Sequence, residues 1–453
     1  MKKHILLGIF LISNLAFSQS KSDSIQFEKI STEILNNGQS YHNLKELTKG
    51  IGHRLSGSAS YDKAVEWAQK QLKEAGAEKV WLQEVMVPVW DRGKESLKIK
   101  THNGQWKNIK MLSLGNSEGT KGKDVVGEII MVKSFEDYDK LSPEQVKNKI
   151  VFFNYPFQQR FVKTFHAYGD AAGYRVQAAS LTAEKGGKFA IIRSISSAFD
   201  DVPHTGVMRY DTSYEKVPAV AIGSSTADEL AKLLQNQKIE AKLNSNCGMK
   251  GEKLSYSVIG EIKGKKDNSV IVVGGHLDSW DVGEGAHDDG AGIVQSIEVL
   301  RTFKKLNIVN NHTIRVVCFA NEENGAKGGA KYAEEAKRNN EKHIFAIESD
   351  AGGFSPRGIS MEMDAQKIQQ IESWKKLFFP YGVYDFTERG SGVDVRPLHT
   401  LLGVPTAELL PDPQRYFDIH HTEEDTFEKV NRRELLMGST VMTQLIYMID
   451  QNW

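Results

Sequence analysis

Cysteine is scarce in this sequence. The 453 residues include only two cysteines, Cys247 and Cys318. Two cysteines cannot form a disulfide framework, and they cannot supply the four thiolates of a common structural zinc site. If the chain binds a metal ion, we therefore expect histidine, aspartate and glutamate side chains to hold it.

An excess of charge of either sign is also absent. The chain has 58 basic and 58 acidic side chains, so its formal net charge is zero. Proteins that bind nucleic acid through the phosphate backbone usually carry a surplus of lysine and arginine. We therefore expect no nucleic-acid partner, and a ligand that is small or at least not a polyanion.

Long apolar runs are missing after the N-terminus, so no later segment is expected to span a membrane. The first residues instead have the pattern of an export signal: Lys2 and Lys3, an apolar stretch that reaches Leu15, and a small-x-small cleavage site at residues 16–18. We predict a signal peptide over residues 1–18 and a secreted or periplasmic protein. A retained membrane anchor is the alternative, and no cysteine follows the apolar stretch to carry a lipid.

From about residue 256 the chain alternates buried strands with amphipathic helices. This alternation is typical of a mainly parallel α/β sheet. The elements predicted there are strands at 270–273, 313–319, 344–347 and 405–410, and helices at 290–303 and 326–337.

Residues 124–245 have a different pattern. Short strands are predicted at 127–132, 150–154, 189–193 and 217–222, with one helix at 171–184. None of these strands ends in a cluster of ligand-type side chains. We interpret this stretch as an inserted module that lies outside the chemistry, in a chain too long for one ordinary core.

Residue types that bind metal ions follow the strands of the α/β part or a loop near the C-terminus. They are His276, Asp278, Asp288, Glu322, Glu323, Asp350, His420 and His421. Ligands of open α/β sheets bind beyond the carboxyl ends of the strands, so we expect these side chains to converge. Each has an ordinary interpretation when taken alone, because Asp288 could be a helix N-cap and Glu322 a charge at a helix start. Four separate loops are much less expected to converge by chance.

Five of these side chains form a complete set for two metal ions. His276, Asp288, Glu323, Asp350 and His421 supply two imidazoles, two terminal carboxylates and one bridging carboxylate. Two Zn²⁺ ions a few ångströms apart need this mixture. The carboxylate of Glu322 is then free to act as a base.

The motifs around these residues resemble the five metal-site motifs of the co-catalytic zinc aminopeptidase family. They are GHLDS at 275–279, GAHDDG at 285–290, NEENG at 321–325, ESDAG at 348–352 and HTEEDT at 421–426. The longer string HLDSWDVG at 276–283 is similar to a carboxypeptidase branch of that family. The resemblance runs from about Leu44 to the C-terminus and implies a three-layer, mainly parallel mixed sheet of the zinc-exopeptidase type.

The resemblance also implies roles for the ligands. His276 and Asp350 would bind one zinc ion, Glu323 and His421 the other, and Asp288 would bridge both. The activity implied is hydrolysis of a terminal peptide bond of a short peptide, by an aminopeptidase or a carboxypeptidase.

Three further residues have roles implied by the same resemblance. Glu322 would be the general base, and the carboxylate of Asp278 would orient a metal-bound imidazole. His420 stands where many members have a tyrosine, and we expect it to donate a hydrogen bond to the oxyanion.

The domain division implied is a signal peptide over 1–18, the first part of a peptidase domain over 19–123, a protease-associated domain over 124–245 and the rest of the peptidase domain over 246–453. A homodimer is also implied, without a membrane span after signal removal.

Three other functions stay open at this point. GNSEG at 115–119 matches the nucleophile elbow of serine hydrolases, but residues 120–123 do not favour the helix that must follow, so we interpret it as a turn. A binding protein that has lost catalysis, and a single-zinc cyclase that acts on N-terminal glutamine, are the others. The complete ligand set favours the peptidase.

Overall fold

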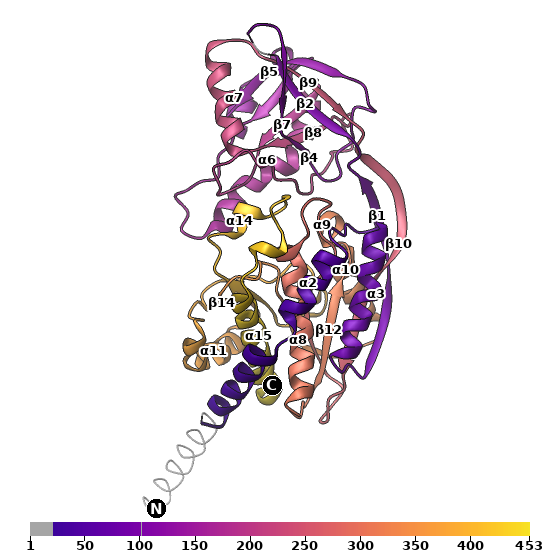
Figure 1. Cartoon of the computed structure of the whole chain (residues 1–453), viewed down its shortest axis with the longest axis vertical. Helices are drawn as coiled ribbons and strands as arrows, with labels where there is room; N and C mark the ends of the chain where they lie inside the picture. The colour runs from indigo at the N-terminus through magenta and orange to yellow at the C-terminus, as the bar shows by residue number, and fades with distance from the viewer. Residues whose placement is uncertain (1–20, 101) are drawn as a thin grey trace, which may run out of the picture.

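The computed structural model describes residues 21–100 and 102–453. These residues form two β-sheets, one above the other in Figure 1, with helices packed against each. The predicted signal peptide lies outside the described residues. Within them, no helix combines the length and the apolar character that a membrane-spanning segment needs.

The first sheet has seven strands in the order β1-β10-β12-β11-β13-β15-β14. Its strands are β1 (Lys79–Asp91), β10 (Gly248–Ile262), β11 (Val270–His276), β12 (Thr313–Phe319), β13 (His343–Glu348), β14 (Pro356–Glu362) and β15 (Thr406–Pro411). The four central strands, from β12 to β15, are parallel, whereas β1, β10 and β14 pair antiparallel at the edges. The sheet is therefore mixed, as expected, with parallel strands at its centre and antiparallel strands at both edges.

Helices cover both faces of the first sheet and complete a three-layer architecture. One face packs against α2 (Ser40–Gly50), α3 (Ala59–Glu74), α8 (Ala291–Lys305), α11 (Ala365–Ser373), α12 (Lys375–Phe378) and α15 (Arg432–Asn452). The other face packs against α10 (Lys327–Arg338) and α13 (Arg396–Leu402). Layers of this kind bury both faces of the central strands.

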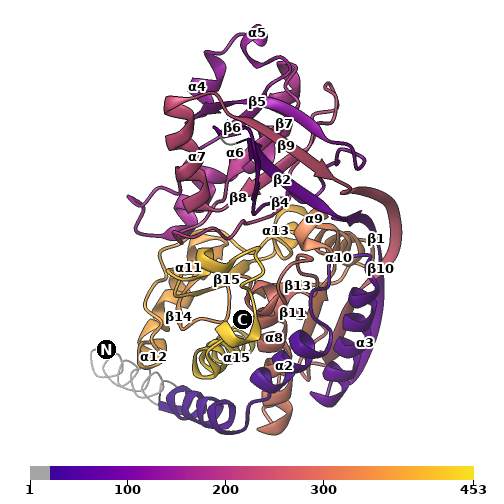
Figure 2. The same cartoon turned by 45° about the horizontal axis from the view of Figure 1, so that its top comes forward.

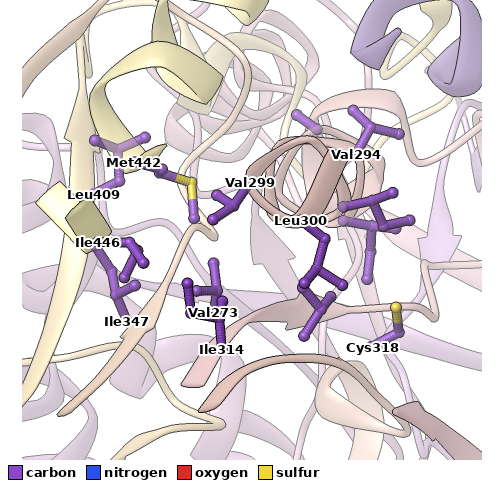
Figure 3. Close-up of a cluster of buried hydrophobic side chains, with 14 of the residues drawn as sticks. Val273, Val294, Val299, Leu300, Ile314, Cys318, Ile347, Leu409, Met442 and Ile446 are labelled. Atoms are coloured by element: carbon purple, nitrogen blue, oxygen red, sulfur yellow. The ribbon is translucent and has the colours of Figure 1, made fainter. Parts of the chain in front are cut away.

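The core explains why the sequence pattern was strong in this part of the chain. Every residue of β11 and of β12 is buried, so both strands read as nearly continuous apolar runs. Helix α8 packs onto them through Leu300, which points toward the strands that carry Val273 and Ile314 (Figure 3). The predicted strand at 313–319 has the bounds of β12.

The second sheet has eight strands in the order β3-β2-β9-β5-β6-β7-β8-β4. They are β2 (Glu95–Lys100), β3 (Trp106–Ile109), β4 (Leu112–Ser113), β5 (Val125–Val132), β6 (Ile150–Phe153), β7 (Phe189–Arg193), β8 (Ala219–Ile222) and β9 (Glu240–Ser245). We call residues 95–245 the second module. Its first three strands precede residue 124, because the segment 95–113 pairs with β8 and β9.

Helices of the second module are more numerous than the single helix predicted at 171–184. They are α4 (Phe135–Asp139), α5 (Pro143–Val146), α6 (Thr164–Glu184) and α7 (Ser224–Asn236). Only three residues of α7 are buried, namely Ser224, Ala227 and Leu230. Helix α6 starts seven residues before the predicted position, and its first turns lie against the first sheet's domain, where Thr164 donates to the carbonyl of Pro413.

One antiparallel ribbon joins the two parts of the molecule. The chain leaves the first sheet along β1 and returns along β10, with Asp91 opposite Gly248 at the end of the pairing. Figures 1 and 2 show this ribbon along one side of the molecule. The second module is therefore inserted between two neighbouring strands.

Truncation of Leu300 tests the core between α8 and the sheet. Leu300→Ala should lower the free energy of unfolding by about 2–5 kcal/mol, because the fully buried side chain leaves a cavity. Unfolding in urea measures the change. Lys305→Ala, an exposed position on the same helix, should stay within about 0.5 kcal/mol of the wild type. Equal effects of the two substitutions would contradict this packing.

Candidate metal centre

The carboxyl ends of the central parallel strands carry the ligand-type residues. Strand β11 ends at His276, β12 leads to Glu322 and Glu323, and β13 leads to Asp350. Parallel strands present these ends at one edge of the sheet, so the three segments meet there. Two loops, around Asp288 and around His421, bring further side chains to the same place.

A first group of acceptor atoms surrounds the imidazole of His276. Its Nε2 lies 3.1 Å from Asp288 Oδ1 and 3.2 Å from Asp350 Oδ1. Its Nδ1 lies 3.0 Å from the backbone carbonyl oxygen of Asp278. A neutral imidazole that donates from Nδ1 has only a lone pair at Nε2. Three acceptors then face one another, which favours a cation between them.

A second group surrounds His421. Its Nε2 lies 3.2 Å from Asp288 Oδ2 and 3.2 Å from Glu323 Oε2. Its Nδ1 faces the carbonyl oxygen of Thr205 at 3.4 Å. The other oxygen of Glu323 accepts a hydrogen bond from the backbone amide of Trp280. Again an imidazole lone pair and two carboxylate oxygens converge.

Asp288 belongs to both groups. Its Oδ1 faces His276, and its Oδ2 faces His421. Among the described residues, no donor forms a hydrogen bond with the buried Oδ2. A buried carboxylate oxygen without a partner is costly, so the site fits a metal ion on each side of this side chain.

Electrostatics at the first group also favour positive charge. Burial alone would lower the pKa of His276, but the carboxylates of Asp350 and Asp288 raise it well above its usual value. The site therefore stabilises a cation at this imidazole. At His421, burial is the dominant effect and lowers the pKa, so its ring is neutral and its lone pair is available to a metal.

Glu322 lies beside these groups without belonging to either. Its side chain lines the same cavity as Asp288, Glu323 and Asp350. Burial, with the nearby carboxylates of Asp350 and Asp288, raises the pKa of Glu322 well above its usual value. A raised pKa suits a carboxylate that accepts a proton and later releases it.

Asp278 makes different contacts from those expected. Its carboxylate accepts hydrogen bonds from the backbone amides of Glu322 (3.1 Å) and Glu323 (3.3 Å). The distance from Asp278 Oδ1 to His276 Nδ1 is 3.8 Å, which is longer than a hydrogen bond. The backbone carbonyl of Asp278, and not its carboxylate, therefore contacts the imidazole, while the carboxylate fixes the turn that carries Glu322.

His420 is more distant from the shared carboxylate than His421 is. Its Nε2 lies 3.7 Å from Asp288 Oδ2, against 3.2 Å for His421, and the two rings stack with centroids 3.5 Å apart. Burial, together with His421, lowers the pKa of His420 well below its usual value. Its ring is therefore neutral near pH 7.

Supporting contacts hold the ligand loops in place. Fully buried Arg54 donates to the backbone carbonyls of Leu277, Glu284 and Gly285, which flank the loop that leads to Asp288. None of the motifs recognised in the sequence contains Arg54. Its backbone partners lie more than 220 residues away, so no local signal marks its role.

The carboxylate of Asp425 also supports the bridging side chain. It accepts hydrogen bonds from the backbone amides of His287 (2.8 Å) and Asp288 (3.1 Å). Asp425 lies in the HTEEDT motif that also contains His421. This motif therefore supplies one metal-type side chain and fixes the backbone of another.

Residues of the second module also lie at the site. The amide of Thr205 donates to the carbonyl of His421 (3.0 Å), and His204 Nδ1 lies 2.7 Å from the carbonyl of His420. A cavity of about 280 Å³ above the metal-type residues is also lined by Tyr168 and Arg175 of α6. The module therefore lies against the site, while the metal-type residues all come from outside it. Short polar segments gave no sign that α6 reaches the sheet edge.

The nucleophile-elbow pattern around Ser117 has no catalytic geometry. No helix follows it, and the turn interpretation is correct. Ser117 is buried, and its Oγ accepts a hydrogen bond from the amide of Ala219 (3.0 Å). Among the described residues, no histidine contacts this hydroxyl. Its contacts are those of a structural serine.

The sequence of this chain is similar to those of known proteins. Residues 257–446 match the model of Peptidase family M28. The chain is 31% identical to carboxypeptidase Q of Homo sapiens, over 97% of this chain and 92% of that protein. It is 30% identical to carboxypeptidase Q of Bos taurus, over 96% of this chain and 92% of that protein.

Solved structures agree with this result. A peptidase M28 precursor from Shewanella amazonensis SB2B superposes with a TM-score of 0.89 at 32% identity, covering 96% of this chain and 98% of that chain. BSAP, a zinc aminopeptidase from Bacillus subtilis, superposes with a TM-score of 0.65 at 19% identity, covering 90% of this chain and 93% of that chain, which shows the fold alone.

The similarity to the zinc aminopeptidase family that the motifs predicted is thereby confirmed. Identity of about 30% over nearly the full length of both chains accompanies a site built from imidazoles and carboxylates. This chain belongs to peptidase family M28 and is a metallopeptidase.

Proposed function

We propose that this protein is an exported exopeptidase that uses two zinc ions to hydrolyse a terminal peptide bond of short peptides. The observation that carries the proposal is the position of Asp288, whose two carboxylate oxygens face different imidazoles, those of His276 and His421. A carboxylate shared by two cations is what a two-metal hydrolytic site requires.

The proposed ligands divide into two sets around the shared side chain. His276 and Asp350 would hold one zinc ion, Glu323 and His421 the other, and Asp288 both. When bound, zinc would lower the pKa of a water molecule and stabilise negative charge on the substrate carbonyl oxygen.

Glu322 is the proposed general base. It takes a proton from the attacking water as the water oxygen bonds to the carbonyl carbon of the substrate. It returns this proton to the amine nitrogen as the carbon–nitrogen bond breaks. The hydrogen bonds from the amides of Glu322 and Glu323 to Asp278 support this role, because they fix the turn that aims Glu322.

His420 is the proposed donor to the carbonyl oxygen. Its neutral ring can donate one hydrogen bond to an oxygen that gains negative charge in the transition state. Its longer distance to Asp288 supports the assignment of His421, and not His420, to the metal.

The remaining parts of the proposal concern the whole chain. The signal pattern at residues 1–18 supports export. The second module would be a protease-associated domain that covers the site, and its hydrogen bonds to the loop of His420 and His421 support this assignment.

Removal of the shared carboxylate tests the two-metal proposal. Asp288→Ala should lose zinc from both positions, whereas Asp350→Ala should weaken one position only, because Asp350 contacts a single imidazole. Zinc content after dialysis, measured by mass spectrometry of the metal, gives the stoichiometry. Glu66→Gln, an exposed acid on α3, should keep the wild-type content. The same loss from both site variants would contradict a bridging Asp288.

Neutralising the general base tests the mechanism. Glu322→Gln should keep its zinc while kcat falls by about 100-fold or more, because a typical general base contributes at least that factor. Steady-state hydrolysis together with zinc content measures both effects. Near-normal turnover would remove Glu322 from this role.

The reaction itself can be tested on purified protein. We expect cleavage of unblocked dipeptides and short peptides into amino acids, lost with a zinc chelator and kept with a serine-directed reagent. Mass spectrometry of the products identifies the bond cleaved. Loss of ammonia from peptides with N-terminal glutamine, without cleavage, would instead identify a cyclase.

A further inference from the structure

The cavity above the metal-type residues has one buried cation on its wall. Arg175, on α6 of the second module, is only 6% exposed, and it lines this cavity together with Glu322 and Asp288. Arg396 also lines the cavity, but it is exposed and donates to the backbone carbonyl of Ser391. Of the two arginines on this wall, Arg175 is therefore the one less accessible to water.

The guanidinium of Arg175 has incomplete partners. Its Nε donates to the carbonyl of Val207 (3.3 Å), and its Nη2 donates to the hydroxyl of Tyr168 (2.8 Å). No residue in 21–100 or 102–453 accepts a hydrogen bond from its Nη1, and no carboxylate of these residues lies within 4.0 Å of it. A buried charge without a counter-charge is costly, so it favours an anion from outside the chain.

The other buried arginines show the contrast. Arg92 pairs with Asp281 at 2.6 Å, and Arg315 pairs with Glu261 at 2.8 Å. Arg54 places all three of its nitrogens on backbone carbonyls. Among the arginines that the structure buries, only Arg175 has neither a carboxylate partner nor a backbone carbonyl for each of its three nitrogens.

Gly206 brings Arg175 next to a proposed metal ligand. A Cβ atom at Gly206 would come within 2.6 Å of Arg175 Nη1 and within 2.7 Å of His421 Nδ1. The backbone there has a φ of +130°, which other residues rarely adopt. The guanidinium and the imidazole are therefore separated by a residue without a side chain, and any larger residue would push them apart.

We infer that Arg175 binds the free C-terminal carboxylate of the peptide substrate. This inference rests on the proposed function. A bond cleaved next to a chain end lies within one residue of the terminal charge, about 4 Å along the chain. A cavity of about 280 Å³ that contains both Glu322 and Arg175 can therefore hold the scissile carbonyl near the first and the carboxylate near the second.

The orientation of the substrate follows from this assignment. The C-terminal residue lies on the side of His421 and α6, where Tyr168 and Phe417 form an aromatic wall. A guanidinium matches a carboxylate with two parallel hydrogen bonds, which a peptide amide cannot reproduce. The second module thus supplies the residue that distinguishes a chain end from the middle of a chain.

Substrates that differ only in terminal charge test the inference. We would compare alanyl-alanine, its C-terminal amide, and alanyl-aspartic acid α-amide, which has a carboxylate only on its side chain. Arg175→Met should lower kcat/KM for alanyl-alanine by about 100-fold or more and for its amide by less than about threefold, since only the acid loses a charged hydrogen bond. Arg209→Met, an exposed position of the same module, should change neither value.

Binding measurements give an outcome that does not depend on turnover. Calorimetry with the zinc-loaded protein should show that alanine binds more tightly than alaninamide, and that Arg175→Met abolishes this difference. Arg175→Lys keeps the charge without the planar fork and should lose part of the preference. This variant also serves if the methionine variant does not fold.

Several results would overturn the inference. If Arg175→Met lowered kcat/KM equally for alanyl-alanine and for its amide, Arg175 would be a structural residue. A loss confined to the aspartic acid amide would assign Arg175 to an acidic side chain instead. Tighter binding of alanine, lost in the variant but without hydrolysis of any peptide by the wild type, would contradict the proposed function and leave the carboxylate site standing.

Discussion

The carboxylate of Asp288 sets the constraint on which the rest of the site depends. Its two oxygens face two imidazoles, and no donor of the described residues satisfies Oδ2. Such a convergence of acceptors is unstable in a protein interior unless cations occupy it. The neighbouring contacts hold this unfavourable arrangement together: the carboxylate of Asp425 fixes the backbone at Asp288, and Arg54 fixes the loop before it.

The second module contributes to the same arrangement from the opposite side. Thr205 and His204 bind the backbone of the loop that carries His420 and His421. Ser196 and Ser197 add hydrogen bonds to Phe417 and Asp418, just before this loop. The metal-type residues therefore come from the sheet edge, but their geometry depends on both parts of the molecule. A movement of the second module would therefore also move the backbone that carries His420 and His421.

Secondary structure was predicted from the sequence most accurately for elements whose residues are all buried. The bounds of strand β12 were predicted correctly because each of its residues is buried and most of them are apolar. Helix α7 was missed because few of its residues face the core. The metal-type residues could be found because they follow strands that share one sheet edge. The structure places them together, and the resemblance to family M28 is confirmed by the relatives.

Contacts between distant segments could not be predicted in the same way. The carboxylate of Asp278 binds two backbone amides 44 and 45 residues away, which spacing alone does not reveal. Arg175 lies on α6, and its proximity to His421 exists only after the two sheets are assembled. Side chains that depend on tertiary approach leave no periodic signal.

The ribbon of β1 and β10 has a consequence for how such a molecule can arise. Because the chain departs and comes back on adjacent strands, with Asp91 opposite Gly248, a whole folding unit can be added or deleted there without a break in the hydrogen bonds of the seven-stranded sheet. A short hairpin between β1 and β10 would complete the same seven-stranded sheet. Substitutions in the second module can therefore reshape the wall above the site while the residues at the sheet edge stay the same.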